Sequence, residues 1–496
     1  MFESAELGHQ IADAKYEREV PKLREALLAA QADVLERKAF PVVLLISGVE
    51  GAGKGDTLHV LHEWMDPRHV RASAFDEPDC VEKEHPSVWR FWQALPPSGT
   101  TGVFFGAWYR EAIYGRIYGG EKRAALQTRL DAIVRFERML TDEGALVLKL
   151  WLHLSKKQQH AKLKELASSK RSRWRVKDSD WRNHEHYDEF RSVGEEVIEK
   201  TSTSAAPWIV IAGEDTNYRR LTVGRAVLDA IRTRLAVPKA PSRETAPLVE
   251  LVDSTQRLRD LDQKTKLASQ EYERALARAQ GEIAFLSREA SKKKRAAVLV
   301  FEGPDAAGKG GAIRRVTEAL DARHYRVNAV AAPNEVERSH PYLWRFWKNI
   351  PRDGEIGIFD RSWYGRTLVE RVEGFAKVSE WARAYSEIND FEEDLAAHGA
   401  IVLKFWLHIT KEEQLRRFRE RQGEGYKRFK ITGEDWRNRK KWEAYEKAAC
   451  DTFDRTSTTH APWTVVAAND KRSARVTVLE TFAKRLRESL GKGGAG

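Results

Sequence analysis

The pattern of apolar and polar positions divides the chain into short buried strands that alternate with amphipathic helices. In the second half, runs of apolar and β-branched residues predict strands at 299–301, 327–331, 356–360, 401–407 and 464–467. Helical periodicity predicts an opening helix over residues 16–38 and a longer, charge-rich one over 248–294. Strands that alternate with helices predict an α/β domain, in which a parallel sheet is covered on both faces.

The same pattern of strands, helices and motifs occurs twice along the chain. A shift of 255 residues carries Lys54 onto Lys309, and it superimposes a series of aromatic and basic motifs without net insertion. We therefore expect tandem α/β domains of one fold, at residues 1–236 and 248–496, with the Pro-rich stretch 237–247 as their linker. The matching motifs are Trp89-Arg90-Phe91-Trp92 with Trp344-Arg345-Phe346-Trp347, Trp108-Tyr109 with Trp363-Tyr364, and Asp180-Trp181-Arg182-Asn183 with Asp435-Trp436-Arg437-Asn438.

The strand at 299–301 leads into a glycine-rich loop with a lysine at its end. The spacing Gly-x-x-x-x-Gly-Lys between a buried strand and a helix predicts a loop whose backbone N–H groups and Lys309 bind phosphate. A Ser or Thr normally follows this lysine to hold magnesium; Gly310 stands there, so Asp305 is the nearest candidate ligand. The alternative is a simple strand-to-helix turn with a surface lysine. The loop residues assigned to substrate binding are Gly303, Ala306, Ala307, Gly308, Gly310 and Gly311.

A second candidate site lies at the end of the strand 356–360. An aspartate at the carboxyl end of a parallel strand, beside a phosphate loop, is where a magnesium ion that bridges phosphates would be held, and Asp360 occupies that place. The guanidinium of Arg361 could bind a transferring phosphoryl group through two oxygens. Alternatively, the two residues simply cap the next helix.

A basic stretch over residues 411–441 carries twelve Lys or Arg against six Asp or Glu. Within it Arg417 and Arg421 are four residues apart, which places them on one face of a helix. Such a helix could close over a phosphate-rich ligand as a lid. The alternative is an ordinary solvated charged face.

The two halves differ at these candidate sites. The shift of 255 places Phe105 opposite Asp360, Gly106 opposite Arg361 and Glu50 opposite Asp305. Opposite Arg417 and Arg421 stand Lys162 and Leu166. Since phenylalanine cannot ligate magnesium and glycine cannot bind phosphate through a side chain, we expect the first half to be catalytically inactive.

Composition narrows the class of protein and the class of partner. The 496 residues are 42% hydrophobic and 32% charged, as in globular proteins, and the formal net charge of +11 favours a phosphate-rich or otherwise polyanionic partner. Two cysteines, Cys80 and Cys450, provide neither a disulfide framework nor a cysteine metal site, which predicts a reducing, cytoplasmic setting. We expect no membrane partner and, in the absence of a nucleic-acid-binding motif, no nucleic acid; a homo-oligomer beyond the internal pair of domains remains open.

These motifs together resemble the polyphosphate kinase 2 family over nearly the whole chain. The loop Gly303–Gly311 and the run Asp360-Arg361-Ser362-Trp363-Tyr364-Gly365-Arg366 carry the resemblance. It implies a P-loop kinase-like α/β/α fold with a helical lid, and an enzyme that uses inorganic polyphosphate and Mg²⁺ to phosphorylate nucleotides. It implies metal and phosphoryl roles for Asp305 and Asp360. Polyphosphate or transition-state contacts are implied for Lys309, Arg361, Arg417 and Arg421.

The continuation through Arg366, Glu370 and Arg371 is similar to the subgroup that converts AMP to ADP, so we also expect these three residues at the substrate. The resemblance thus predicts a polyphosphate:AMP phosphotransferase. Three alternatives stay open: an enzyme that phosphorylates ADP or GDP, a nucleotide kinase that uses ATP, and a non-catalytic module that binds polyanions.

Overall fold

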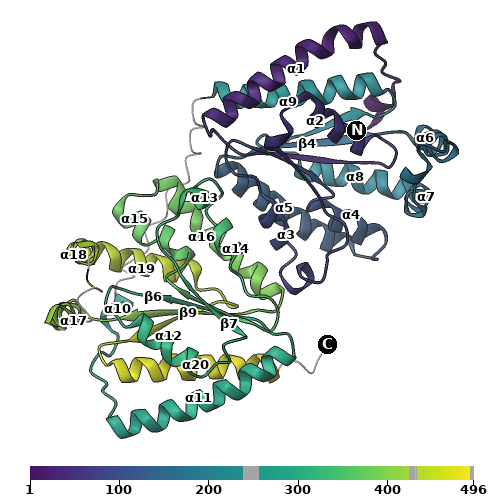
Figure 1. Ribbon diagram of the computed structural model, residues 1–496. Coiled ribbons are helices and arrows are strands. Elements are labelled where there is room, and N and C mark those ends of the chain that lie inside the picture. Colours follow the sequence, from purple (N-terminus) through teal and green to yellow (C-terminus); the bar gives the residue numbers. More distant parts are fainter. Residues whose placement is uncertain (238–255, 424–430, 432, 492–496) are drawn as a thin grey trace. The chain divides into compact units, whose positions relative to one another are not determined.

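The computed structural model describes residues 1–237, 256–423, 431 and 433–491 (Figure 1). The chain forms two compact units, one of residues 1–78, 90–241 and 333–344 and the other of residues 79–89, 242–332 and 345–496. Apart from residue 237, the predicted linker 237–247 lies outside the described residues. Within the described residues, no helix is long and apolar enough to cross a membrane.

Each unit is built on a five-stranded parallel sheet of the same topology. In the first unit the order is β2-β3-β1-β4-β5, and in the second the matching order is β7-β8-β6-β9-β10. The predicted strands of the second half are confirmed, with ends that shift by a few residues. The strands are β1 (Val42–Gly48), β2 (Val70–Ala74), β3 (Thr101–Phe105), β4 (Leu146–His153), β5 (Trp208–Ala212), β6 (Ala297–Glu302), β7 (Tyr325–Ala329), β8 (Ile356–Asp360), β9 (Ile401–His408) and β10 (Trp463–Ala467).

Helices cover both faces of each sheet, which confirms the predicted α/β/α architecture (Figure 1). In the first unit α1, α2 and α9 pack on one face, and α4, α5 and α8 on the other. The first half contains η1 (Glu3–Glu6), α1 (Asp13–Glu36), α2 (Lys54–Trp64), η2 (Pro67–His69), η3 (Glu82–Glu84), α3 (Trp89–Ala94), α4 (Tyr109–Ile117), α5 (Arg123–Asp142), α6 (Lys156–Ser168), η4 (Arg173–Arg175), α7 (Asp178–Glu185), α8 (Tyr187–Thr201) and α9 (Thr216–Ala236).

In the second unit α11, α12 and α20 pack on one face, and α16 and α19 on the other. The helices that follow β4 and β9, namely α6 with α7 and α17 with α18, stand where a lid is predicted. The second half contains α10 (Gln256–Arg259), α11 (Ser269–Lys292), α12 (Lys309–Thr317), α13 (Glu335–Arg338), α14 (Trp344–Trp347), η5 (Trp363–Arg366), α15 (Val369–Glu373), α16 (Val378–Ala397), α17 (Lys411–Gly423), α18 (Gly433–Lys440), α19 (Trp442–Thr456) and α20 (Lys471–Gly491).

The helix predicted over 248–294 is wrong in its extent. Residues up to 255 lie outside the described part of the chain, and α10 and α11 are separate helices. Between them the Asp262 carboxylate accepts hydrogen bonds from Lys264 N at 2.9 Å and Thr265 Oγ1 at 2.7 Å. An aspartate that bonds its own downstream backbone in this way competes with helical hydrogen bonds, so the helix is interrupted here.

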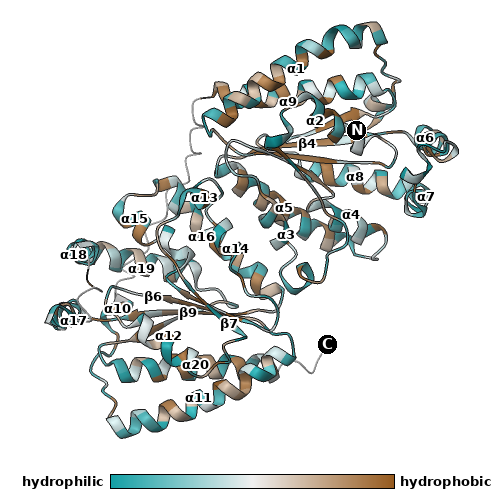
Figure 2. Cartoon of the chain, viewed as in Figure 1, coloured by the Kyte–Doolittle hydropathy of each residue, from teal (hydrophilic) through white to brown (hydrophobic). Residues whose placement is uncertain are grey.

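Apolar strands form the core of each unit, as the brown sheets of Figure 2 show. In the second unit Leu299, Phe301 and Phe405 of the central strands pack with Leu479 and Phe482 of α20, all of them fully buried. Two central strands buried on both faces explain why their sequences are continuously apolar instead of alternating.

One polar group interrupts this apolar core in the same way in both units. Lys404 on β9 is fully buried, and its Nζ donates to Glu392 Oε2 at 2.7 Å and to the Tyr364 hydroxyl at 2.9 Å. In the first unit Lys149 makes the same bonds to Glu137 at 2.7 Å and Tyr109 at 3.1 Å. Because the network is complete in both units, it is part of the scaffold and does not distinguish one unit from the other.

Candidate active site

The phosphate loop of the second unit joins β6 to α12. Gly303 has a φ of 140°, and a Cβ atom there would lie 2.3 Å from the Leu407 carbonyl oxygen, so only glycine fits against β9. Gly308, with a φ of 110°, precedes Lys309 at the start of α12. The Lys309 Nζ donates to the Gly303 carbonyl at 2.7 Å, inside the turn of the loop. A helix N-terminus and a lysine thus meet at the carboxyl edge of the sheet, which is an anion-binding arrangement.

Arg417 holds this loop from behind. Its side chain is 2% exposed, and Nη1 donates to the carbonyls of Ala306 at 2.9 Å and Ala307 at 3.0 Å. Nη2 donates to the carbonyl of Ala468, after β10, at 2.7 Å. Burial lowers the pKa of Arg417, and the bond to Glu413 opposes that shift. These contacts support a positioning role; the phosphoryl contact expected for Arg417 stays a prediction.

Arg421 lies one turn further along α17 and is half-buried. The stretch that would complete the predicted lid of this unit, residues 424–430 and 432, lies outside the described residues. Arg417 and Arg421 therefore share a helix but differ in surroundings, since only Arg417 is enclosed by the loop.

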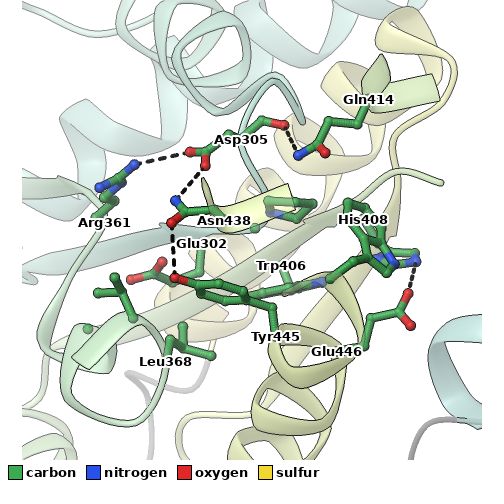
Figure 3. Close-up of a pocket in the computed structure, with 15 residues that line it drawn as sticks. Glu302, Asp305, Arg361, Leu368, Trp406, His408, Gln414, Asn438, Tyr445 and Glu446 are labelled. Atoms are coloured by element: carbon green, nitrogen blue, oxygen red, sulfur yellow. Dashed lines mark hydrogen bonds and ion pairs between the residues drawn. The ribbon is translucent and has the colours of Figure 1, made fainter. Parts of the chain in front are cut away.

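Asp305, inside the loop, meets Arg361 from the end of β8 (Figure 3). Arg361 Nη2 donates to Asp305 Oδ1 at 3.1 Å, and Asn438 Nδ2 of α18 donates to Oδ2 at 2.9 Å. Burial alone would lower the pKa of Arg361, but the surrounding carboxylates, Asp305 first, raise it above its ordinary value. Two of the predicted site residues, 56 positions apart in sequence, are thus in direct contact.

Asp360 stands beside them at the carboxyl end of β8. It pairs in register with Phe301 of β6, so it lies one strand away from the point where the phosphate loop begins. Asp305 and Asp360 offer oxygen ligands, and Mg²⁺ is commonly held by one or two carboxylates together with substrate phosphates. Within the described residues no group of three or more carboxylate, His or Cys side chains is arranged so that it could hold a metal ion by itself. A magnesium ion held by this pair would take its remaining ligands from the substrate and water, and the metal roles of both residues stay predictions.

A third carboxyl group at this edge was missed in the sequence. Glu302 ends β6 and is 5% exposed, and its Oε1 accepts a hydrogen bond from Ser362 Oγ at 2.8 Å. Burial raises the pKa of Glu302, and the nearby Asp360 charge adds to that rise. An acidic residue that closes an otherwise apolar strand was the available signal. The first half has Ser47 and Ala107 at these two positions, so the pair belongs to the second unit alone.

The three residues predicted from the continuation lie beyond this cluster. Arg366 Nε forms an ion pair with Glu370 Oε2 at 2.8 Å. Arg371 donates to Asp451 Oδ2 at 2.6 Å and to the Tyr385 hydroxyl at 2.8 Å. Arg371 is thus held by α16 and α19, and its predicted substrate contact stays a prediction, as do those of Arg366 and Glu370.

A small cavity of about 90 Å³ adjoins the loop on the side of α19 (Figure 3). Asp305 lines it from the loop, Arg361 from the end of β8, and Trp406, His408 and Tyr445 from β9 and α19. Burial lowers the pKa of His408 from 6.5 to about 4, so this ring is neutral near pH 7. Glu446 Oε1 lies 3.9 Å away, too far for a hydrogen bond that would restore the charge.

The first unit has the same loop with different side chains. Gly48 and Gly53 have φ angles of 128° and 92°, close to their counterparts in the second unit. Lys54 Nζ donates to the Gly48 carbonyl at 2.9 Å and pairs with Glu50 Oε2 at 3.0 Å. At the end of β3, Phe105 and Gly106 supply neither a carboxylate nor a guanidinium. The first unit thus retains the phosphate loop but lacks the carboxylate and the guanidinium that are expected to act on a bound phosphate.

The arginine that lies beside the loop also differs between the units. In the first unit Arg219 of α9 donates to the Gly213 carbonyl, after β5, at 2.7 Å, and a Cβ atom on Gly53 would lie 2.5 Å from its guanidinium. Arg219 is opposite Ala474 in the repeat, and Arg417 is opposite Lys162. The two arginines therefore lie beside equivalent loops of the two units but come from different helices.

Comparison with known proteins identifies the family. The family described as Polyphosphate kinase 2 matches residues 10–238 and, a second time, residues 266–492. The chain belongs to this family. A polyphosphate:AMP phosphotransferase of Pseudomonas aeruginosa is 52% identical over 97% of this chain and 98% of its own length. A polyphosphate:AMP phosphotransferase of Pseudomonas syringae is 49% identical over 99% of each chain. A crystal structure described as a putative polyphosphate kinase 2 from Pseudomonas aeruginosa superimposes with a TM-score of 0.90, at 50% identity, over 99% of this polyphosphate kinase 2 chain and 100% of that one.

Proposed function

We propose that the protein is a polyphosphate:AMP phosphotransferase and that its second unit carries the reaction. One observation supports the second unit above all: the phosphate loop with Lys309 lies beside Asp360, and its Asp305 is bonded to Arg361 at 3.1 Å. The choice of AMP as acceptor rests on the names of the full-length relatives.

In the proposed reaction an oxygen of the AMP phosphate attacks the terminal phosphorus of polyphosphate in line. A new P–O bond forms, and the bond to the bridging oxygen breaks. That oxygen keeps the electron pair, and the polyphosphate leaves one unit shorter. The attacking oxygen is already anionic, so no general base is required, and positioning and charge neutralisation supply most of the rate.

The side chains of the second unit divide these tasks. Lys309 and the backbone N–H groups of the loop hold phosphate oxygens. Arg361 can release its hydrogen bond to Asp305 and bind the transferring phosphoryl group instead. Asp305 and Asp360 would hold magnesium, which when bound neutralises charge on the phosphates. Arg417 keeps the loop in shape through its carbonyl contacts.

The direct test is to incubate the protein with Mg²⁺, polyphosphate and AMP, and to follow the formation of ADP. ADP and GDP as acceptors test the first alternative, and ATP without polyphosphate tests the second. A non-catalytic polyanion-binding module would form no product, and Asp360→Asn would tighten its binding because a negative charge is lost. A cytoplasmic setting is proposed from the two cysteines alone.

A further inference from the structure

The first unit contains a cavity of about 890 Å³ above its phosphate loop. It is lined by the loop itself and by the helices that follow β4, through Lys162 of α6, Arg175 of η4 and Lys177 at the start of α7. Cavities of several hundred Å³ accommodate small-molecule ligands. A unit expected to be inactive therefore keeps a large hollow at the place where its loop would bind phosphate.

The charge of this cavity suits an anion. Its lining contains seven Lys or Arg against four Asp or Glu. Asp56 is paired with Arg219 at 2.7 Å and with Arg220, and these bonds hold its pKa at about 2 although burial opposes them. Glu50 is paired with Lys54. Arg175 and Lys177 are exposed at the opposite wall. Once Lys54, Arg219 and Arg220 are paired, four cations of the lining remain against two carboxylates, Asp76 and Asp180.

The space beside Gly53 in the loop of this unit is filled by an arginine from another helix. Arg219 occupies the place that Arg417 has in the second unit, so Lys162, opposite Arg417 in the repeat, is released to line the cavity. Lys162 pairs with Glu165, whose side chain is 67% exposed, and such surface pairs hold a lysine weakly. A lysine is thus gained at the cavity without loss of the loop.

What this unit lacks is the machinery for turnover. Phe105 and Gly106 stand where the second unit has its Asp-Arg pair, so the end of β3 offers no carboxylate, and Glu50, opposite Asp305, is already paired with Lys54. We propose that the cavity is a second, metal-independent site that binds a linear run of phosphate groups, namely inorganic polyphosphate, and does not transfer them. The identity of this ligand, though not the site, rests on the proposed function.

The spread of cations favours a polymer over a single phosphate. Lys54 lies in the loop, whereas Arg175 and Lys177 belong to the segment after α6, and a chain of phosphates offers each of these cations an anionic group of its own. Trp174, 71% exposed beside Arg175 with the guanidinium 5.2 Å from its ring, could stack on a base. A nucleotide is therefore the alternative that the test must separate from polyphosphate.

The test measures binding to the full chain and requires no turnover. The parent carries Lys309→Ala and Arg361→Gln, which weaken the site of the second unit, and calorimetry in EDTA follows polyphosphate of defined length. We expect binding to persist. Adding Lys162→Ala and Lys177→Ala should weaken it by roughly tenfold or more, as expected when two charged contacts to phosphate are lost.

Two further variants guard against misfolding and non-specific attraction. Glu50→Gln removes the carboxylate that pairs with Lys54 and should tighten polyphosphate binding severalfold, a gain that a damaged fold cannot give. Lys200→Ala removes an exposed lysine paired with Asp131 outside the cavity, and it should leave the affinity unchanged. AMP and inorganic phosphate are titrated separately into the same parent.

The proposal is overturned if the parent binds no polyphosphate in EDTA, or if the Lys162→Ala, Lys177→Ala form binds as well as Lys200→Ala. Tight binding of AMP with weak binding of polyphosphate would instead identify a nucleotide site. Formation of ADP by the unaltered protein without polyphosphate binding in the first unit would overturn this inference and leave the proposed function intact. Binding of polyphosphate in the first unit without any formation of ADP would support this inference and overturn the proposed function.

Discussion

Gly106 and Arg361 occupy equivalent positions in the two units and share a left-handed backbone, with φ angles of 71° and 63°. Glycine adopts this conformation freely, whereas a residue with a Cβ is destabilised there by about 1–2 kcal/mol. The second unit therefore keeps an arginine at a strained position, and that arginine is the one bonded to Asp305. Strain of this kind is tolerated at functional sites.

Arg361→Gly should stabilise the second unit relative to Arg361→Ala by about 1 kcal/mol, because both variants lose the guanidinium and only glycine relieves the backbone. Both should lose nearly all turnover. Chemical denaturation and kcat measure the two effects. A glycine variant less stable than the alanine variant would contradict the interpretation of Arg361 as strained.

Asp360→Asn should abolish turnover and leave the fold intact, because the change removes a metal-binding charge at almost constant volume. Initial rates with Mg²⁺ and circular dichroism measure activity and fold. The matched control is Asp321→Asn in the turn before β7, where the carboxylate pairs with Arg323. Near-normal rates for Asp360→Asn would exclude it as a metal ligand.

Lys309→Ala and Lys54→Ala should differ in their effect on kcat. Both lysines close well-formed loops, so phosphate binding alone predicts comparable losses. Only the loop of Lys309 lies beside an aspartate and an arginine, so its loss should exceed that of Lys54→Ala by at least roughly tenfold. The comparison is made at saturating AMP and polyphosphate. Equal losses would mean that the first unit takes part in the chemistry.

Replacing Arg417 and Arg421 separately should distinguish loop support from ligand contact. Arg417→Gln leaves buried carbonyls without donors, which should destabilise the second unit by about 3 kcal/mol and lower kcat through the loop. Arg421→Gln should raise the KM for polyphosphate with little change in stability. Thermal denaturation and kinetics are measured on both. If neither replacement changes a kinetic constant, Arg417 supports only the fold and neither arginine contacts the ligand.

The buried His408 predicts a loss of stability in acid. Its pKa is about 4 in the folded protein and 6.5 when unfolded, so the unfolded chain binds its proton first as the pH falls. The contribution of the neutral His408 ring to the free energy of unfolding is complete above about pH 6.5. It is lost as the pH falls towards 4, and the total change is about 3 kcal/mol. Hydrogen exchange of the β9 amides measures it. In His408→Gln this slope should flatten, while in the partly exposed His186→Gln it should persist.

The sequence predicts the scaffold well because the scaffold is local and repeated. Apolar runs fix the strands, and the shift of 255 residues fixes the second copy, so the family and the α/β/α architecture are confirmed. The contact between Asp305 and Arg361 follows from the same logic, since parallel strands end at one edge.

What the sequence could not predict depends on tertiary contacts. The bond between Ser362 and Glu302 joins residues 60 positions apart whose pairing has no periodic signal. The position of Arg219 beside the loop was invisible because a fixed shift compares this residue with Ala474, not with Arg417. When only equivalent positions are compared, the first unit looks as though it has lost the arginine beside its loop. The comparison does not reveal that another helix supplies an arginine to the same place.

The exchange of Arg219 for Arg417 has a consequence for protein engineering. A chimera that received α6 in place of α17 would contain no arginine behind its loop, because α20 offers only Ala474 there. The opposite graft would direct two guanidinium groups to a space that holds one. Neither lid can therefore be exchanged by itself. A functional graft has to include the helix after the last strand, α9 or α20, as well.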